Sequence, residues 1–519
     1  MKKKLIITFL LGILTLLLFY NLGEYNQPTA DLWLNRSYKF FYEVKTKNFD
    51  QTYIFYHPGV TLMWLVGPVV YYFPKYTNYL YNQTINPFDA RVFYEFNKLA
   101  LIPIVTTIFG VIILNLYLIK KIFSKNIALI FLSLLISEPF LIGNIRSIHV
   151  DALQTFFIFT CFISLLYYTK ISQYKYIIIS GLFLGLALLT KVTSIIFIPF
   201  IGLILLASNQ TKYTLKKTLL LTTLNFTILI FSTIVMFYIV WPVMWTDPIQ
   251  TLSNIYQDGI AESGFEHNLG YDYMYFANIP NNSLITKLLH YPIQFIFRTN
   301  GFLLILLTIS LIYIFKLKKQ ILQKENLVLI LLSLLSIYYI ILMSTSGKMI
   351  FRYLLIIYPF FHLFLSIGIN SLLKTRFKFI IVILLFLAIS ESLLTSTNSL
   401  TYYNSLLNGI TGSKNTIYTD QAGAGLYQIV LDLNNISNIE NKSVAIYDYN
   451  SFSSFYAGDT LKLKNHNYTT NTVNTDFVII GVQNDTKYFD IDRKDYKLIK
   501  EYKYKEQTHW SLYKKLSTI

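Results

Sequence analysis

The stretch LALIPIVTTIFGVIILNLYLI, residues 99–119, contains no charged residue. An uncharged apolar run of about 20 residues is what a helix needs to cross the hydrocarbon core of a bilayer. This run therefore predicts a membrane-spanning helix. The rest of the chain divides around it into similar runs and the polar segments that join them.

The overall composition agrees with a membrane protein. Of 519 residues, 54% are hydrophobic and only 14% are charged, which is too apolar for an ordinary soluble protein. In a soluble protein a formal net charge of +17 would suggest nucleic acid or other anionic partners, but most basic residues here lie in short loops and indicate topology. Cys161 is the only cysteine, so the chain has no intrachain disulfide and no multi-cysteine metal site.

Ten further apolar runs have roughly the length of a membrane span. They are Leu5–Tyr20, Ile127–Ile142, Ala152–Tyr168, Tyr176–Leu189, Val192–Ala207, Thr218–Trp241, Pro292–Phe315, Leu327–Met343, Tyr353–Leu373 and Phe379–Leu394. No cleavage site of the A-x-A type follows the first run, which favours a retained anchor over a signal peptide. The sequence therefore predicts a mainly α, polytopic protein with about eleven transmembrane helices.

Basic residues alternate between loops, and they predict the orientation of the spans. Every second short loop carries several lysines or arginines, beginning with Lys2–Lys4 before the first run. Because basic loops are retained in the cytoplasm, we expect a cytoplasmic N-terminus in the plasma (inner) membrane. The large loops 21–98 and 242–291 and the segment 395–519 are then extracytoplasmic.

The segment after residue 394 differs in character from the spans. SVAIYDYNSF (443–452) and DFVIIGV (476–482) are typical of short strands, and GAGLYQIVLDLNN (423–435) is typical of a helix. We therefore expect two domains, a transmembrane module at 1–394 and a small extracytoplasmic α/β domain at 395–519.

Ionisable residues inside or beside the spans gather at their predicted outer ends. They are Glu138, Arg146, His149, Asp151, Lys191, Arg298, Lys348, Arg352 and Glu391. Such residues are costly in a membrane and are functional candidates. For each one alone, snorkelling to the interface is the alternative. As a set, the four cations Lys191, Arg298, Lys348 and Arg352 oppose the positive-inside bias and would suit a phosphate or pyrophosphate at the outer surface.

The first outer loop contains TADLWLNRSYKFFYEVKTKNFDQTYIFYHPGVTLMWL, residues 29–65. It is far longer than most connections, and it is aromatic and acid-bearing, so we interpret it as one wall of an active site. Its tyrosines and tryptophans suit stacking on a sugar, although aromatic belts at a membrane interface are an alternative explanation.

Several stretches resemble the GT-C glycosyltransferases, in particular the branch that contains protein O-mannosyltransferases and the bacterial aminoarabinose transferases. The similar stretches are YHPGVTLMW (56–64), RSIHVDALQTFF (146–157), LGLALLTKVTSIIFIP (184–199), WPVMWTDP (241–248), ESGFEHNLGYDYMYF (262–276), YPIQFIFRT (291–299), GKMIFRYLLIIYPF (347–360) and TYYNSLLNG (401–409), with DQAGAGL (420–426) after it. This resemblance implies a GT-C-like bundle and a polyprenyl-phosphate sugar as the donor.

The resemblance also implies an acidic general base in the first outer loop. Asp31 stands at that place, with leucine where the family often has a second acid. A carboxylate there takes the proton from the acceptor hydroxyl in an inverting transfer while the lipid phosphate departs. Glu24 and Glu43 are the alternatives, and Asp31 could instead only cap a helix beginning at Leu32.

Other site residues follow from the same resemblance. His57, Asp151, Glu266 and His267 are expected to bind substrate, and Lys191, Arg298, Lys348 and Arg352 are expected to hold the carrier phosphate. For Asp151 the alternative is simple helix capping, and for His57 a structural role in a bend with Pro58 and Gly59. No metal or other cofactor is expected, because the branch is metal-independent and no paired acids or His-x-x-x-His occur.

The sequence thus predicts a membrane glycosyltransferase that moves a sugar from a polyprenyl phosphate to a protein, lipid or glycan acceptor outside the cytoplasm, with no role for nucleic acid. A flippase or transporter of lipid-linked glycans is the main alternative. A catalytically degenerate family member is another, because the second acid is missing. A transporter would place acids and broken helices near the bilayer midplane in related halves, and the sequence shows no such repeat.

Overall fold

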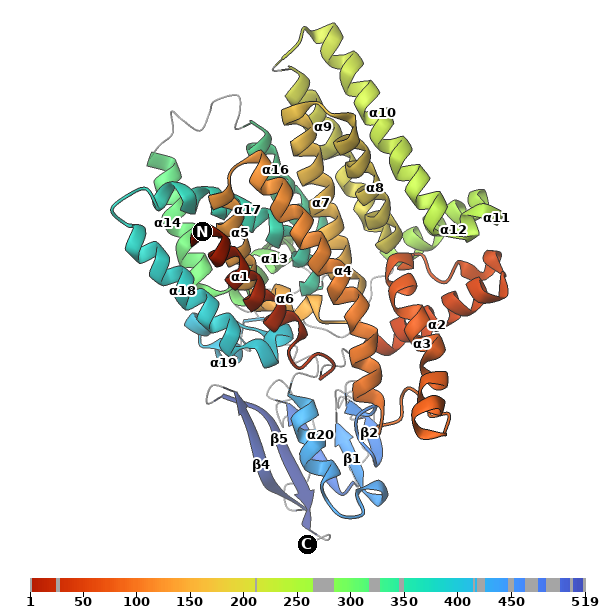
Figure 1. The fold of residues 1–519 in the computed structure, drawn as a ribbon. Helices are drawn as coiled ribbons and strands as arrows, with labels where there is room; N and C mark the ends of the chain where they lie inside the picture. The colour runs from red at the N-terminus through yellow and green to blue at the C-terminus, as the bar shows by residue number, and fades with distance from the viewer. Residues whose placement is uncertain are drawn as a thin grey trace.

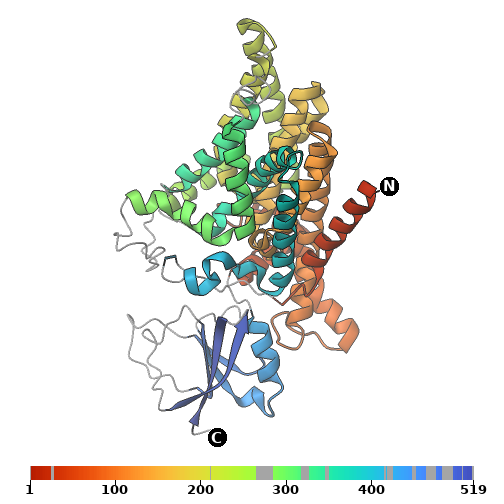
Figure 2. The same cartoon turned by 90° about the vertical axis from the view of Figure 1, so that its left-hand side faces the viewer.

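The computed structural model describes residues 2–24, 29–210, 212–264, 284–316, 327–344, 350–413, 416–417, 425–446, 452–462, 475–481, 495–504 and 507–516. Helices form one large bundle, and a small sheet lies at one end of it (Figure 1). A view from the side shows the sheet at the same end of the bundle (Figure 2). The predicted class, a mainly α membrane protein with a small C-terminal α/β unit, is confirmed.

The α-helices of the described residues run in the following order. They are α1 (Lys2–Phe19), α2 (Ala30–Thr46), α3 (Val60–Tyr81), α4 (Phe93–Ile122), α5 (Lys125–Ile136), α6 (Pro139–Ile145), α7 (Val150–Ile171), α8 (Tyr174–Thr190), α9 (Ile198–Gln210), α10 (Leu215–Val240), α11 (Val243–Thr246), α12 (Pro248–Gly264), α13 (Leu284–Arg298), α14 (Gly301–Lys316), α16 (Leu327–Ser344), α17 (Ile357–Leu372), α18 (Lys378–Leu394), α19 (Gly409–Ser413) and α20 (Leu426–Asn434).

Short 3-10 helices punctuate the breaks between these elements. They are η1 (Phe49–Thr52), η2 (Val192–Phe197), η5 (Phe351–Ile356), η6 (Ser396–Thr401), η7 (Ser405–Leu407) and η8 (Ile439–Asn441). Two of them, η2 and η5, each precede a longer helix and begin a membrane span.

The described helices account for a multi-pass membrane protein. Five are long and apolar enough to cross a bilayer, or up to seven if each of two bent pairs counts as one span. Three shorter apolar helices, Leu5–Phe19, Tyr174–Thr190 and Ser333–Ser344, accompany them. The described residues therefore contain fewer full-length spans than the eleven predicted runs, because several runs form short or bent helices.

Two of the predicted runs form bent helix pairs in the structure. The run Ile127–Ile142 breaks into α5 and α6, which meet at 78°. Pro139 begins α6, and a residue before proline disfavours helical backbone, so the chain turns at Glu138. The run Pro292–Phe315 breaks into α13 and α14 at 112°, where the Asn300 side chain caps α14 by accepting from the Phe302 N–H at 3.0 Å.

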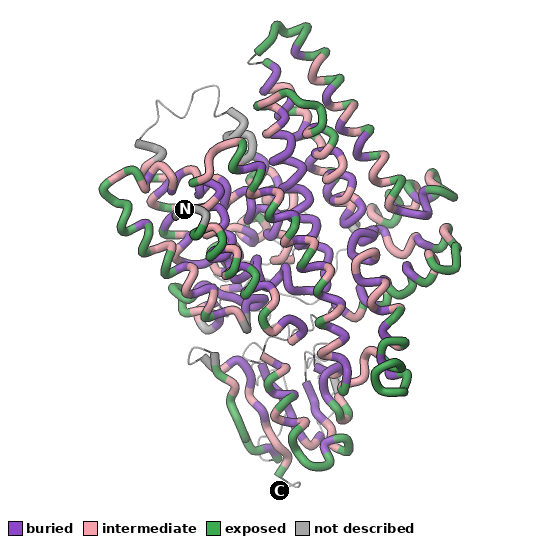
Figure 3. The backbone as a smooth tube through the Cα atoms, viewed as in Figure 1, coloured by how far each residue is buried: buried purple, intermediate pink, exposed green. Residues whose placement is uncertain are grey.

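Helix α7 forms the centre of the bundle. In its most apolar window 94% of residues are buried inside the protein, against 22% for α10, which faces outward. The burial map shows the same contrast between the interior helices and the exposed long helix α10 (Figure 3). Because α7 is enclosed by protein, polar side chains at its end can be shielded from both lipid and water.

The first outer loop is largely helical. Its segments α2 and α3 pack against each other beside the bundle (Figure 1). The Gly67 backbone lets them approach closely, since a Cβ there would lie 2.7 Å from Cβ of Phe41. The loop is therefore a folded hairpin of helices with a buried face, and α2 carries Asp31 in its first turn.

The C-terminal unit contains a five-stranded sheet in the order β2-β1-β3-β5-β4. Its strands are β1 (Ser443–Ile446), β2 (Asp459–Lys462), β3 (Phe477–Gly481), β4 (Tyr496–Tyr504) and β5 (Gln507–Lys515). β1 pairs in parallel with β2 and β3, whereas β5 pairs antiparallel with β3 and β4. The predicted strands around 443–452 and 476–482 and the helix within 423–435 are confirmed as β1, β3 and α20.

Aromatic contacts join this unit to the bundle. Phe93 at the start of α4 contacts Phe455 with ring centroids 4.7 Å apart, and Tyr94 stacks on Tyr427 at 5.3 Å. The preceding residues 396–413 pack elsewhere, against α6, α13 and α18. The proposed domain boundary at 394 stays a prediction.

Candidate functional site

Asp151 is the centre of a polar cluster at the end of α7. Its Oδ1 lies 2.9 Å from the ammonium nitrogen of Lys191, and its Oδ2 lies 3.0 Å from Nδ1 of His149 and 3.4 Å from Nε of Arg352. Four side chains from three separate parts of the chain, which the sequence places at span ends, thus meet at one carboxylate.

Local structure explains why these side chains converge. His149 is the N-cap of α7, and Asp151 lies in its first turn. Lys191 directly follows α8 and precedes η2, and Arg352 lies in η5. Each lies at or next to a point where a helix begins, ends or changes type. At such points the chain changes direction, and the polar side chains can point toward one another instead of toward the apolar sides of the helices.

Polar contacts from α7 hold Lys191 in place. The side-chain amide of Gln154 donates to the hydroxyls of Thr193 at 3.0 Å and Ser194 at 2.9 Å, both in η2. The Ser194 hydroxyl also donates to the Ala187 carbonyl in α8. These bonds fix the turn between α8 and η2, and hence the direction of Lys191 toward Asp151.

The cluster is buried and carries a net positive charge. His149, Asp151 and Lys191 are buried, and the Arg352 side chain is 15% exposed. Burial, with the Arg352 cation, lowers the pKa of His149 to about 4, so its imidazole is neutral near pH 7. Two cations and one carboxylate therefore leave one unit of positive charge, and the Arg352 side chain is the most exposed of the four.

The aromatic ring of Tyr353 completes the surroundings of Lys191. The Lys191 ammonium nitrogen lies 4.0 Å from the ring centroid, in cation–π geometry. Tyr353 is not among the site residues that the sequence predicts. Its place next to Arg352 in an aromatic-flanked span end was the available signal, but tyrosine is too common in this chain to stand out.

Helix α2 approaches the cluster through Trp33. The Trp33 ring lies edge-on to the His149 ring, with centroids 6.0 Å apart, and the Arg36 guanidinium lies 4.9 Å from Trp33. Trp33 is likewise not among the predicted site residues. It connects the first turn of α2, which contains Asp31, with the Asp151 cluster.

Asp31 is half-buried in the first turn of α2. The helix begins at Ala30 and its N-cap is Thr29, so the alternative in which Asp31 caps a helix starting at Leu32 is wrong in register. A carboxylate in a first helical turn is stabilised by the helix dipole, which favours its charged form. Of the alternative bases, Glu43 lies near the far end of α2, and Glu24 lies in the turn after α1.

The bend at His57, Pro58 and Gly59 is pinned beside Lys191. The Gly59 N–H donates to the Thr190 carbonyl at 3.1 Å, and the hydroxyls of Thr61 and Thr190 lie 2.6 Å apart. Gly59 adopts a φ of 60°, and a Cβ there would lie 2.2 Å from Cζ3 of Trp33. His57 itself is half-buried against the Tyr56 ring, with centroids 4.1 Å apart.

Arg298 lies on the other side of η5 from Asp151. It is fully buried, donates from Nη2 to the Tyr403 hydroxyl at 2.6 Å and lies 3.8 Å from the Phe351 ring centroid. Its predicted contact with the carrier phosphate stays a prediction. Lys348, Glu266 and His267, the remaining predicted site residues, lie outside the described residues.

A second polar cluster lies where the two bent helix pairs meet. Asn300, between α13 and α14, donates to the carbonyl of Ser137, between α5 and α6, at 2.9 Å and to that of Ala388 in α18 at 3.1 Å. These bonds connect the two breaks with each other and with α18. The fully buried Glu138 faces His362 at 4.0 Å. Broken helices with buried acids are also features of transporters, which is the alternative function that the sequence leaves open.

The residues that the structure describes contain no group of three or more His, Cys, Asp or Glu arranged to hold a metal ion. The expectation that no metal is required stays a prediction. The Asp151 cluster already supplies fixed positive charge from side chains.

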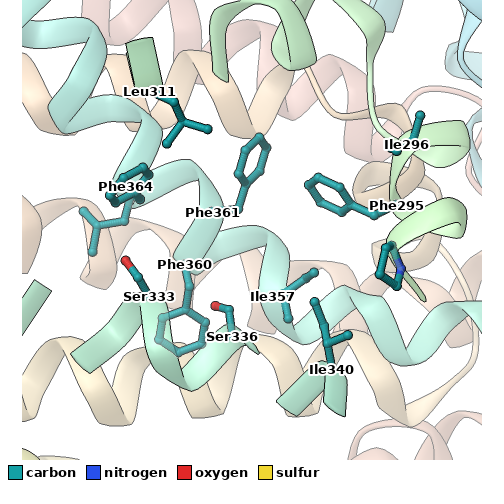
Figure 4. Close-up of a pocket in the computed structure, with 12 residues that line it drawn as sticks. Phe295, Ile296, Leu311, Ser333, Ser336, Ile340, Ile357, Phe360, Phe361 and Phe364 are labelled. Atoms are coloured by element: carbon teal, nitrogen blue, oxygen red, sulfur yellow. The ribbon is translucent and has the colours of Figure 1, made fainter. Parts of the chain in front are cut away.

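An apolar pocket of about 500 Å³ opens beyond η5. Its walls come from four helices, α13, α14, α16 and α17, and are formed by Pro292, Phe295, Ile296, Leu311, Ser333, Ser336, Ile340, Ile357, Phe360, Phe361, Leu363 and Phe364. Phe295 and Phe361 face each other across part of it (Figure 4). Ile357 directly follows η5, so the pocket wall is continuous in sequence with the segment that carries Arg352.

Comparison with known proteins places these features in context. Residues 8–248 match the model of the dolichyl-phosphate-mannose-protein mannosyltransferase family. This match includes Asp31, His57, Asp151 and Lys191 and ends before Arg352. A search of curated protein sequences gave no match.

Solved structures give distant similarities. ArnT from Cupriavidus metallidurans bound to undecaprenyl phosphate is 9% identical over 98% of this chain and 97% of that one, with a TM-score of 0.47. The same protein in the apo state gives 11% identity, 70% and 59% coverage and a TM-score of 0.45. The oligosaccharyltransferase AglB from Archaeoglobus fulgidus, in complex with an inhibitory peptide and a dolichol-phosphate, is 12% identical over 88% of this chain and 64% of that one, with a TM-score of 0.41. The chain thus spans about three fifths of the length of apo ArnT and AglB. Residues 8–248 are thus similar to the mannosyltransferase family, and the solved structures add only distant similarities of fold.

Proposed function

We propose that this protein is a membrane glycosyltransferase that transfers a sugar from a polyprenyl-phosphate donor to an acceptor on the outer side of the membrane. The observation that carries the proposal is the net positive charge of the buried Asp151 cluster, in which Lys191 and Arg352 share one carboxylate. A buried excess cation is costly unless an anion completes it. The phosphate of the donor supplies that anion.

The apolar pocket supports a lipid-linked donor. Its wall continues from η5 at Ile357, so a donor whose phosphate lies at Arg352 can place its first isoprene units against Phe360 and Phe361. Its volume of about 500 Å³ lies within the usual range of sites for small molecules. The proposal therefore places the charged head of the donor at Arg352 and its apolar tail at the pocket that the same segment of the chain helps to form.

Asp31 is the proposed general base of an inverting transfer. It would accept the proton of the acceptor hydroxyl as the oxygen attacks the anomeric carbon, while the bond from that carbon to the phosphate oxygen breaks. The leaving phosphate keeps the bonding electron pair, and Lys191 and Arg352 would stabilise its added charge. His57 and, among the residues outside the described ranges, Glu266, His267 and Lys348 are proposed to contact substrate.

The orientation proposed for the chain places the cluster at the extracytoplasmic surface of the plasma membrane, with a cytoplasmic N-terminus. The Lys-rich loops carry this assignment. The acceptor is a protein, a lipid or a glycan; the small sheet lies at the end of the bundle where the acceptor would approach.

A second candidate, a flippase of lipid-linked glycans, is favoured by the two bent helix pairs. Asn300 bonds both breaks to α18 and α5, and residues 396–408 pack against them, so we propose that the bends are fixed supports of the bundle and not parts of a transport cycle. We therefore rank the enzyme first.

The purified protein in lipid nanodiscs distinguishes the two functions. It is given a panel of polyprenyl-phosphate sugars with membrane extract as acceptor, and release of polyprenyl phosphate is measured. The enzyme releases it with at least one donor, in step with transfer of the sugar. A flippase would move a labelled donor across sealed liposomes and release none, which would contradict the proposed function.

A further inference from the structure

Three consecutive residues of η5 face three different partners. Phe351 lies under the Arg298 guanidinium at 3.8 Å, Arg352 reaches Asp151, and the Tyr353 ring lies 4.0 Å from the Lys191 ammonium nitrogen. The position of this single turn therefore sets the geometry of Arg352 and Lys191 at the same time. Whatever fixes Phe351 also fixes the cations of the proposed donor site.

Arg298 is the residue that packs on Phe351. Its guanidinium also lies 4.5 Å from the Tyr403 ring and 5.3 Å from the Phe140 ring. Within the described part of the chain no carboxylate lies within ion-pair distance of Arg298, and its Nη1 has no hydrogen-bond partner. The described contacts that hold this fully buried cation are therefore aromatic faces and two neutral acceptors, Gln294 and Tyr403.

A segment that we call the strap, residues 396–408, supplies Tyr403. Asn404 anchors it to the end of α13, where its N–H donates to the Phe297 carbonyl at 2.7 Å and its side-chain amide to the Ile296 carbonyl at 3.1 Å. Arg146 holds the start of the strap by donating to the Ser396 carbonyl at 3.0 Å.

Two more contacts seat the strap on the bundle. The Glu391 carboxylate of α18 accepts from the hydroxyls of Tyr402 and Ser405. Gly143 in α6 lies so close to the strap that a Cβ there would meet the Leu400 backbone nitrogen at 2.2 Å. The strap is thus fixed on both sides of Tyr403 and can act as a rigid support.

We propose that the strap positions the donor site indirectly, through Tyr403 and Arg298, without contacting the donor itself. Tyr403 holds the plane of the Arg298 guanidinium, and the guanidinium supports Phe351, so that η5 keeps Arg352 on Asp151 and Tyr353 on Lys191. Arg298 and Tyr403 are then positioning residues of the sugar transfer. The catalytic consequence rests on the proposed function, whereas the structural part can be tested without any substrate.

The shape of arginine is central to this role. A guanidinium is planar and can stack on Phe351 and Tyr403 while donating to Gln294, whereas a lysine ammonium is a point charge without a stacking face. Arg298→Lys therefore keeps the charge and loses the support. A residue that only contacts a phosphate by charge would tolerate this change far better.

Hydrogen–deuterium exchange of the donor-free protein in nanodiscs tests the proposal. The peptide that covers 350–357 is followed in the wild type, in Arg298→Lys and in Tyr403→Phe. Tyr402→Phe is the matched control, because it removes a hydroxyl from the neighbouring tyrosine, while Glu391 keeps its second bond to the strap, from the Ser405 hydroxyl. Size-exclusion profiles establish that each variant folds.

We expect about tenfold faster exchange in η5 for Arg298→Lys and a smaller increase for Tyr403→Phe, with the wild-type rate in Tyr402→Phe. Unchanged exchange in Arg298→Lys overturns the proposal and leaves Arg298 as a direct phosphate ligand. Equal acceleration in Tyr402→Phe also overturns it, since the strap would then act only as a general brace. Failure of the wild type to transfer sugar would count against the proposed function alone.

Discussion

The ammonium nitrogen of Lys191 lies 2.9 Å from Oδ1 of Asp151, and both side chains are buried. Because Arg352 shares the same carboxylate, this ion pair does not neutralise the site. Lys191 balances Asp151 in the free protein, and in the proposed function it would also stabilise an incoming phosphate.

Lys191→Met is expected to weaken binding of polyprenyl phosphate by roughly 10- to 100-fold, since one charge-assisted contact contributes about 1.5–3 kcal/mol. The remaining Asp151–Arg352 pair would carry no net charge. Binding to the protein in nanodiscs is measured by titration with polyprenyl phosphate. Lys39→Met, at an exposed position of α2, is the control. Equal affinities of the two variants would count against a phosphate at this cluster.

Asp151→Ala is expected to destabilise the fold by about 3–5 kcal/mol, because it leaves two cations together without their carboxylate. The thermal unfolding midpoint in detergent measures this loss. Added polyprenyl phosphate should restore part of the midpoint in this variant, since the lipid phosphate would replace the lost negative charge. A variant as stable as the wild type would show that the cluster is solvated.

His149 predicts a pH dependence of stability. Its pKa of about 4 in the folded protein lies below the value of about 6.5 for an unfolded chain. Between these values the unfolded chain binds a proton that the folded one does not, so stability falls as the pH is lowered through this range. His149→Asn, which keeps an amide donor toward Asp151, should flatten the fall of the unfolding midpoint between pH 6.5 and pH 4. Parallel curves for wild type and variant would contradict this.

Gly59→Ala tests the contact between the bend and Trp33. The added methyl group collides with the indole ring, and the alanine must adopt a φ of 60°. Together these two effects cost about 1–3 kcal/mol of folding free energy. Displacing Trp33 also shifts the first turn of α2, so sugar transfer should fall by more than the loss of folded protein explains. Gly110→Ala, where a Cβ meets nothing within 4 Å, is the control. Full activity in Gly59→Ala would separate Trp33 from the site.

Asn300→Ala is expected to lower the stability of the bundle by about 2 kcal/mol, since it removes two buried hydrogen bonds to helix ends and the cap of α14. The midpoint of thermal unfolding measures it, with Asn35→Ala on the exposed face of α2 as control. If the protein is instead a flippase whose bent helix pairs move during transport, Asn300→Ala should increase the rate at which labelled lipid crosses the liposome membrane.

The sequence predicted the class of the fold and the convergence of several site residues for a clear reason. Ionisable residues are rare near membrane spans, so Asp151, Lys191 and Arg352 stood out before their contacts were known. Position at a span end could not distinguish Arg298 from these residues. In the sequence, a cation that contacts a carboxylate and a cation that packs on aromatic rings give the same signal. Partners in space depend on how distant spans pack.

The bends were missed for a different reason. Hydropathy averages over a run and does not register a change of direction, so Ile127–Ile142 resembled one span. The local signals were present, in Pro139 after Glu138 and in the Asn300-Gly301 pair. Tyr353 carried no comparable signal in a chain with 42 tyrosines. Trp33 carried none because tryptophans beside membrane spans are also explained by an aromatic belt at the interface.

The most direct test of the whole account compares Asp31→Asn with Asp50→Asn in the purified protein. Both changes remove one carboxylate from the same outer loop, but Asp50 is exposed and accepts only from the neighbouring Gln51 among its described hydrogen bonds. Sugar transfer from the active polyprenyl-phosphate donor is measured alongside binding of that donor. The account predicts that Asp31→Asn binds donor normally and transfers no sugar, while Asp50→Asn matches the wild type. Normal transfer by Asp31→Asn would contradict it.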